Sequence, residues 1–72
     1  MTNREKIEAL EEVLDCEEGT LQEETELEQV EEWDSMTKLS LSAYMKKEYG
    51  HVLSLKEYEE FITVGDIMRK MK

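Results

Sequence analysis

The sequence contains no proline and only one cysteine, and both features limit the possible folds. Without proline, the residue that most strongly interrupts helices is missing. A single thiol, Cys16, cannot form an internal disulfide, so the sequence does not predict a secreted, disulfide-stapled domain. The sequence also lacks an apolar run near eighteen residues and a basic segment followed by an apolar stretch. We therefore expect a soluble, cytoplasmic chain without a membrane partner.

The length of 72 residues suffices for one domain, which we expect to span residues 1–72. A hydrophobic core of this size supplies about 3–5 kcal/mol of stability and leaves little room for a deep substrate cavity. A carrier or an interaction module therefore suits this length better than a free-standing enzyme. We expect a monomer that catalyses no reaction itself.

Basic residues are scarce, with 9 Lys and Arg against 19 Asp and Glu and a formal net charge of −10. Binding to nucleic acid requires a basic surface that neutralises phosphates, so this charge argues against such a partner and favours basic proteins. Residues 1–34 carry a net charge of −12, whereas residues 35–72 carry +2. The acidic half is either a solvated surface or an electrostatic guide for docking.

The first 33 residues predict one helix and a long loop. A capping box formed by Thr2 and Glu5 opens a helix that we expect to end near Asp15. Residues 16–33 are less regular, and Gly19 marks a break. This loop either contains a short helical turn or spans a long crossing, and we expect it to be held to the core by its apolar residues Leu21, Leu27, Val30 and Trp33.

Three more helices are predicted in the second half, which makes the expected fold an all-α four-helix bundle with a long first loop. The second helix begins at Asp34-Ser35 and ends at Tyr49, before Gly50. A short third helix opens at Ser54, with Leu55, Tyr58, Phe61 and Ile62 expected to face inward. The fourth opens at Thr63, with Asp66 in its first turn and a stripe of Val64, Ile67, Met68 and Met71.

The second helix carries two apolar stripes that point in nearly opposite directions. Leu41, Met45 and Tyr49 form one stripe, and we expect it to face inward. Met36, Leu39 and Ala43 form the other stripe, which begins beside Ser35. A surface helix in so small a domain buries only one stripe, so the second is expected to cover a partner. The alternative is a central helix that is buried on all sides.

One stretch resembles the acyl carrier protein family: Trp-Asp-Ser-Met at residues 33–36, followed by an amphipathic segment that ends at Tyr49-Gly50. The family signature is Asp-Ser-Leu or Asp-Ser-Met, with a large apolar residue five positions further on, here Leu41. The resemblance covers essentially the whole chain, because the helix order and the Thr-Val-Gly-Asp at residues 63–66 also follow the family. It is greatest to stand-alone carriers of specialised bacterial pathways.

The resemblance implies that Ser35 carries a 4′-phosphopantetheine arm through a phosphodiester, with Asp34 as the flanking residue of the motif. Acyl groups would ride on the arm as thioesters, and acyl-loading and acyl-processing enzymes would be partners. A serine is a competent nucleophile only when a base or a metal activates it, and no such group is near Ser35 in the sequence. A separate phosphopantetheinyl transferase with Mg²⁺ is therefore expected to attach the arm from coenzyme A.

The chain departs from the family in its second helix, where Lys38, Lys46 and Lys47 stand and Glu48 is the only acid after Asp34. Many such carriers are rich in acidic residues there, so this difference argues against housekeeping fatty acid synthesis. We expect partner contacts to come from the apolar stripe, from Trp33 and from the acidic residues before it: Met36, Leu39, Ala43, Trp33, Glu28, Glu31 and Glu32.

Several alternatives remain open from sequence alone. Ser35 is also compatible with a plain helix cap worth about 1 kcal/mol. The arm is equally compatible with an aminoacyl, peptidyl or glyceryl cargo, and the helical domain with a small acidic adaptor without a prosthetic group. We expect Cys16 to be an incidental thiol and His51 a surface residue. The Glu-rich segments lack the ligand pattern of a calcium loop, so no metal site is predicted.

Overall fold

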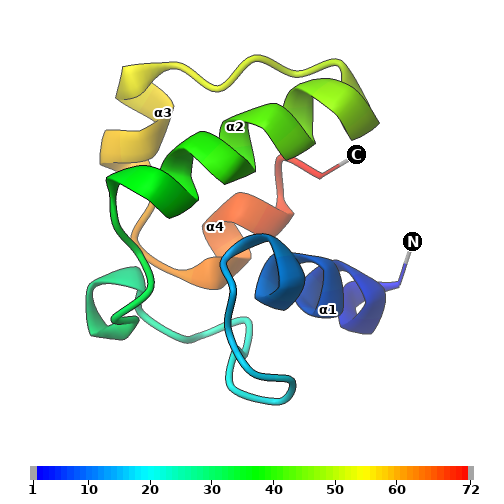
Figure 1. Ribbon diagram of the computed structural model, residues 1–72, viewed down its shortest axis with the longest axis vertical. Coiled ribbons are helices and arrows are strands. Elements are labelled where there is room, and N and C mark those ends of the chain that lie inside the picture. The colour runs from blue at the N-terminus through cyan, green and yellow to red at the C-terminus, as the bar shows by residue number, and fades with distance from the viewer. Residues whose placement is uncertain (1, 72) are drawn as a thin grey trace.

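Four α-helices joined by loops make up the protein, and the computed structural model describes residues 2–71 (Figure 1). The helices are α1 (Asn3–Val13), α2 (Ser35–Tyr49), α3 (Leu55–Glu60) and α4 (Val64–Met68), and a short 3-10 helix, η1 (Leu27–Gln29), lies between α1 and α2. No strand forms within the described residues, so the predicted all-α class is confirmed. No helix in residues 2–71 is long and apolar enough to cross a membrane.

Helix α1 begins as predicted and ends close to the predicted position. The Thr2 hydroxyl oxygen accepts from the N–H of Glu5 at 3.1 Å, and the Glu5 carboxylate accepts from the N–H of Thr2 at 2.9 Å. The sequence predicts an end near Asp15, and the last helical residue is Val13. Asp15 adopts a left-handed φ of 57°, and the N–H of Cys16 bonds back to a carbonyl of the last turn at 2.7 Å. This arrangement satisfies the terminal carbonyls and stops the helix.

The long connection from α1 to α2 is fastened to α1 by a buried carboxylate. Glu11 accepts hydrogen bonds from the N–H groups of Gly19, at 2.8 Å, and Leu21, at 3.0 Å. Leu21 and Leu27 are buried in the core, which confirms that this loop is held to the body of the protein. The short helical turn that the sequence allows within the loop is η1.

The same connection also docks on the start of α4. The N–H of Val64 donates to the carbonyl of Thr25 at 2.9 Å, and the N–H of Gly65 donates to the carbonyl of Glu23 at 2.8 Å. A Cβ atom at position 65 would lie 3.0 Å from that Glu23 oxygen, so the close approach of the two backbones requires glycine. Backbone hydrogen bonds thus join segments about forty positions apart in the chain.

The core lies where α1 packs against both α2 and α4, with α4 between them in the view of Figure 1. The inward stripe of α2 is confirmed, because Leu41 and Met45 are fully buried and Tyr49 is half-buried against the core. The predicted stripe of the fourth helix is buried too, with Met71 just beyond the helix end. The core residues are Leu10, Leu14, Leu21, Leu27, Leu41, Met45, Leu53, Phe61, Val64, Ile67, Met68 and Met71.

Helix α3 is short, as predicted, but it turns fewer side chains inward than predicted. None of its six residues is buried. Phe61 is buried and Tyr58 half-buried, whereas the predicted inward positions of Leu55 and Ile62 are wrong, since these side chains are 76% and 68% exposed. Ile62 follows the helix end, where extended backbone points it away from Phe61. Leu55 lies in the first turn at the rim of an open groove.

Candidate functional site

Asp34, and not Ser35, caps the start of α2. Asp34 Oδ1 accepts the N–H of Thr37 at 3.0 Å, and the Thr37 hydroxyl oxygen accepts the N–H of Asp34 at 3.0 Å. This reciprocal pair satisfies donors that the first turn leaves free, so a capping role for Ser35 is wrong. The hydrogen bond from Thr37 N–H also lowers the pKa of the Asp34 carboxyl, which keeps it ionised and weakly basic.

The Ser35 side chain is exposed on the first residue of α2. Within residues 2–71 its hydroxyl makes no hydrogen bond, so the fold does not use this group. Asp34 is a poor base, and His51 follows the opposite end of a helix about 22 Å long. Neither Asp34 nor His51 is therefore suited to activate this hydroxyl as a nucleophile.

An open groove of about 430 Å³ begins at Ser35 and lies between α2 and α3. Helix α2 contributes Ser35, Lys38, Leu39 and Ser42 to its lining, and α3 contributes Leu55, Tyr58 and Glu59. The groove is therefore lined by two exposed leucines, three hydroxyl groups, one basic side chain and one acidic side chain. Sequence reasoning missed the α3 side of this site, because no local pattern places Tyr58 beside α2.

Trp33 fixes the end of the long loop next to the groove. Its ring centroid lies 6.2 Å from that of Tyr58, and the Lys38 ammonium lies 5.4 Å from the Trp33 centroid. The latter distance is within the range of a cation–π interaction. Trp33 thus anchors the end of the loop directly before Asp34, as predicted. A contact between Trp33 and a partner stays a prediction.

The outer stripe of α2 is exposed as predicted. Met36 is 77% exposed and Leu39 is 72% exposed, and Ala43 is exposed as well. Leu55 of α3 lines the same groove as Leu39, so it extends the apolar surface beyond α2. Four apolar side chains close to Ser35 are therefore left without a covering element within the described residues.

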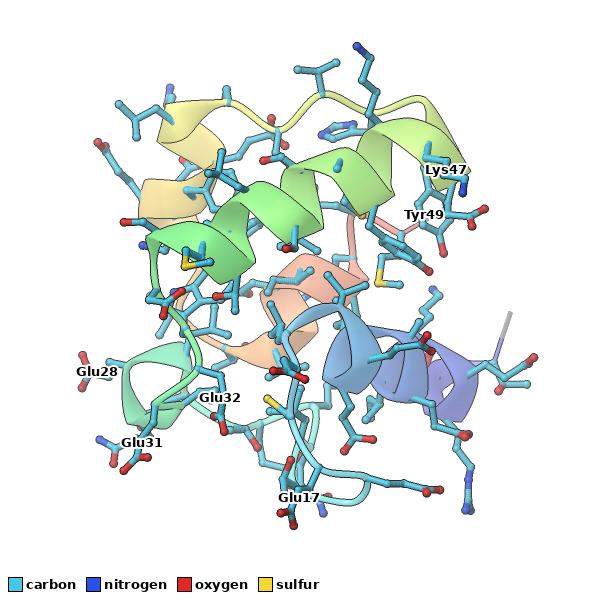
Figure 2. All side chains as sticks on the ribbon, in the orientation of Figure 1. Glu17, Glu28, Glu31, Glu32, Lys47 and Tyr49 are labelled. Carbon is cyan, nitrogen blue, oxygen red and sulfur yellow. The ribbon has the colours of Figure 1, made fainter. Side chains whose placement is uncertain are left out.

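Acidic side chains flank this apolar surface on the loop side. Figure 2 shows Glu28, Glu31 and Glu32 on the segment that leads into α2, while Lys47 lies at the far end of that helix. All three glutamates are exposed. Three exposed acidic side chains therefore lie on the segment directly before the start of α2.

Other candidates show no comparable arrangement. Burial, together with the negative charge of Glu32, raises the pKa of the Cys16 thiol to about 11, so this thiol stays protonated and unreactive. A larger hollow of about 600 Å³ lies next to His51, Arg69 and Lys70, but each of these side chains faces a carboxylate of Glu57 or Asp66. Within residues 2–71 no group of three or more His, Cys, Asp or Glu is placed to hold a metal ion.

No protein-family model matches the chain, and no curated protein or solved structure matches it significantly. The resemblance to acyl carriers therefore depends on the motif at residues 33–36 and on the order of the helices. The surroundings of Ser35 supply independent physical support, because its hydroxyl is exposed, unbonded and next to an apolar surface.

Proposed function

We propose that this chain is a carrier protein that holds acyl intermediates as thioesters on a phosphopantetheine arm attached to Ser35. The proposal depends mainly on one observation, the different roles of two neighbouring residues at the start of α2. Asp34 caps the helix, which leaves the neighbouring Ser35 hydroxyl exposed and without a structural role. Thr37, by contrast, serves the fold, because its hydroxyl bonds to the carbonyl of Glu32. Ser40 is exposed too, but it does not lie at the helix start and does not line the groove.

The surroundings of Ser35 fit the arm in charge and shape. The attached phosphodiester would lie at the N-terminal end of a fifteen-residue helix, where unpaired N–H groups favour an anion. The groove beside it offers apolar walls and hydroxyls to an arm that contains amides, a hydroxyl and methyl groups. When bound, the arm supplies a terminal thiol that carries cargo as a thioester, and the chain itself catalyses nothing.

Attachment requires a separate phosphopantetheinyl transferase with Mg²⁺. The Ser35 Oγ attacks the phosphorus that bears the pantetheine unit of coenzyme A, the phosphoanhydride P–O bond breaks, and 3′,5′-ADP leaves. The serine proton passes to a base of the transferase, since Asp34 is held ionised with a lowered pKa. The four helices would then act as a carrier-type bundle, with α2 presenting the arm.

Partner enzymes would dock on the exposed stripe of Met36, Leu39 and Ala43. The adjacent acidic residues, including Glu31 and Glu32, favour partners whose apolar patch is bordered by basic side chains. Tethering raises the effective concentration of the cargo at each partner. The pathway would be fatty-acid-like, polyketide-like or otherwise specialised.

Mass spectrometry tests the attachment. The chain is incubated with coenzyme A, Mg²⁺ and a promiscuous phosphopantetheinyl transferase, and its intact mass is then measured. We expect a gain of one phosphopantetheine unit, absent in Ser35→Ala and retained in Ser40→Ala, which removes another exposed hydroxyl of α2. No gain with several active transferases would contradict the carrier and favour a small acidic adaptor that lacks a prosthetic group.

The docking surface is tested separately. Leu39→Glu is expected to leave the helical circular dichroism spectrum unchanged, because this side chain is 72% exposed, and to slow cargo transfer to a partner enzyme. Val52→Glu, on the exposed loop after α2, is the matched control and should leave transfer unchanged. Unfolding of Leu39→Glu would mean that the outer stripe belongs to the core.

A further inference from the structure

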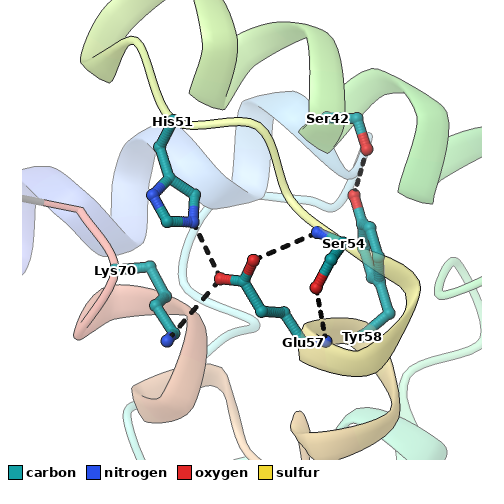
Figure 3. Close-up of polar contacts among 6 residues, drawn as sticks. All are labelled: Ser42, His51, Ser54, Glu57, Tyr58 and Lys70. Carbon is teal, nitrogen blue, oxygen red and sulfur yellow. Dashed lines mark hydrogen bonds and ion pairs between the residues drawn. The ribbon is translucent and has the colours of Figure 1, made fainter.

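One side chain, Tyr58, links α3 to α2 beside the open groove that begins at Ser35. Its hydroxyl donates to the backbone carbonyl of Lys38 at 2.7 Å, and the Ser42 hydroxyl lies 2.5 Å from it as the donor of a second hydrogen bond (Figure 3). Both partners belong to α2, whereas Tyr58 belongs to α3. The hydroxyl therefore ties the two helices together across the floor of the groove that starts at Ser35.

The Tyr58 ring is also packed against aromatic rings. The Trp33 ring lies 6.2 Å away, centroid to centroid, and the Phe61 ring lies 5.7 Å away in an edge-to-face arrangement. Displacing Tyr58 would break two hydrogen bonds and both ring contacts together. Tyr58 is thus held in place by side chains from three segments of the chain.

The groove does not reach the hydrophobic core. None of its lining residues belongs to the buried core of the described chain, and Tyr58 is the one that packs against that core from the outside. Leu41 and Met45, on the inward stripe of α2, are fully buried and do not line the groove. A hydrocarbon chain that starts at Ser35 therefore meets an open groove walled by Leu39, Leu55 and polar groups, and no enclosed cavity in the core.

We infer that the cargo of this carrier stays outside the hydrophobic core, in contact with solvent, because Tyr58 separates the open groove from the core. The inference rests on the proposed function of Ser35. Burial would remove the apolar surface of a long acyl chain from water, which is favourable. A short or polar acyl unit has little apolar surface to bury and gains little from such a site. The cargo class that this arrangement favours is short or polar acyl groups, because a long saturated chain would stay largely exposed to water.

The test compares two cargoes on the full chain. A promiscuous phosphopantetheinyl transferase with Mg²⁺ loads acetyl-coenzyme A or octanoyl-coenzyme A onto Ser35, and the thermal unfolding midpoints of the products are measured. Six extra methylenes buried only in the folded state would raise the midpoint by more than about 10 °C. We expect the two midpoints to agree within about 4 °C, and a larger rise with octanoyl would overturn the inference.

Thioester reactivity gives a second measurement. Hydroxylamine should cleave the octanoyl thioester on the protein within about threefold of its rate on free octanoyl-coenzyme A, because the bond is open to water. Stronger protection would contradict an exposed cargo. If neither coenzyme adds mass, the proposed function itself fails; if both load and octanoyl is sheltered, only the present inference fails.

Variants at Tyr58 test whether this residue separates the groove from the core. Tyr58→Ala removes the side chain that separates the groove from the core. In this variant we expect the octanoyl form to have a higher thermal unfolding midpoint than the acetyl form. Tyr58→Phe keeps the ring and should behave as the wild type does. A folded Tyr58→Ala with equal midpoints would show that Tyr58 is not the separating group. If that variant does not fold, the wild type and Tyr58→Phe decide.

Discussion

Helices α3 and α4 follow one another in the chain and are of similar length, yet they are held in opposite ways. Four of the five residues of α4 are buried, namely Val64, Gly65, Ile67 and Met68, whereas none of the six residues of α3 is. In Figure 1 α4 lies between α1 and α2, while α3 lies beside the N-terminal end of α2, away from α1.

Helix α3 depends instead on polar groups. Glu57 accepts hydrogen bonds from His51 Nε2 at 2.7 Å and from the N–H of Ser54 at 3.1 Å, and Tyr58 bonds to α2 (Figure 3). Apolar burial stabilises α4 at any pH, whereas the contacts of α3 depend on charge and on single hydroxyls. The helix beside the proposed attachment site is therefore the one whose position is set by polar contacts.

The largest effect should come from shortening the buried isoleucine of α4. Ile67 is fully buried, so Ile67→Ala is expected to cost about 2–5 kcal/mol, enough to unfold much of so small a domain. Ile67→Val should cost about 0.5–1.5 kcal/mol and keep the measurement in range. The control on α3, Leu55→Ala, removes a 76% exposed side chain and should change stability by less than about 0.5 kcal/mol in urea unfolding. Equal costs at the two positions would contradict the contrast between the helices.

Glycine at position 65 tests how tightly the long loop docks on α4. In Gly65→Ala the new Cβ meets the Glu23 carbonyl oxygen at 3.0 Å and the Glu23 Cγ at 2.9 Å, so we expect a loss of about 1–3 kcal/mol. The better helix propensity of alanine offsets up to about 1 kcal/mol of that loss. Urea unfolding measures the net effect, and a variant as stable as the wild type would mean that the loop yields without cost.

Many of these features can be predicted from residues that are close together in the sequence. The capping box of Thr2 and Glu5, the end of α2 at Gly50 and the buried pair Leu41 and Met45 all follow from short-range rules. Each depends on residues within two or three turns of one another. The proposed site benefits in the same way, since Asp34 and Ser35 lie at a predicted helix start.

Long-range contacts are where prediction from sequence fails. The hydrogen bonds of Glu11 to Gly19 and Leu21, and the fit of Gly65 against Glu23, depend on how the loop crosses the helices. The exposed position of Leu55 has the same origin, because a helix of six residues has too few positions for a stripe to define its buried side.

Removing one oxygen atom from α3 should have a moderate effect. Tyr58→Phe loses the hydrogen bonds to Lys38 and Ser42, and we expect a cost of about 0.5–1.5 kcal/mol in urea unfolding. Ser42→Ala removes one partner of the same hydroxyl. The double variant should cost less than the sum of the two single changes if the hydroxyls interact. Strict additivity would contradict the hydrogen bond between Tyr58 and Ser42.

The smallest effect, and the one that most directly separates the two helices, is a dependence on acidity. The hydrogen bond from His51, together with that from the Ser54 N–H, lowers the pKa of Glu57 from its ordinary value of 4.5 to about 2. A carboxyl group whose pKa is lower in the folded chain stabilises it fully above the unfolded value and loses that contribution as the pH falls toward the folded value. The advantage of the wild type over Glu57→Gln should therefore be constant above about pH 5 and vanish near pH 2.

Thermal unfolding of both proteins between pH 7 and pH 2 measures this advantage, and Glu59→Gln removes the same charge from α3 as the matched control. Ile67→Val should lose the same stability at every pH at which the chain folds, because its contribution is apolar burial. If the difference between the wild type and Glu57→Gln stayed constant down to pH 2, the contact of His51 with Glu57 would not hold α3 in solution. Helix α3 would then be held mainly by the packing of Tyr58 and Phe61. The Tyr58 hydroxyl would be the main polar group that fixes α3 to α2.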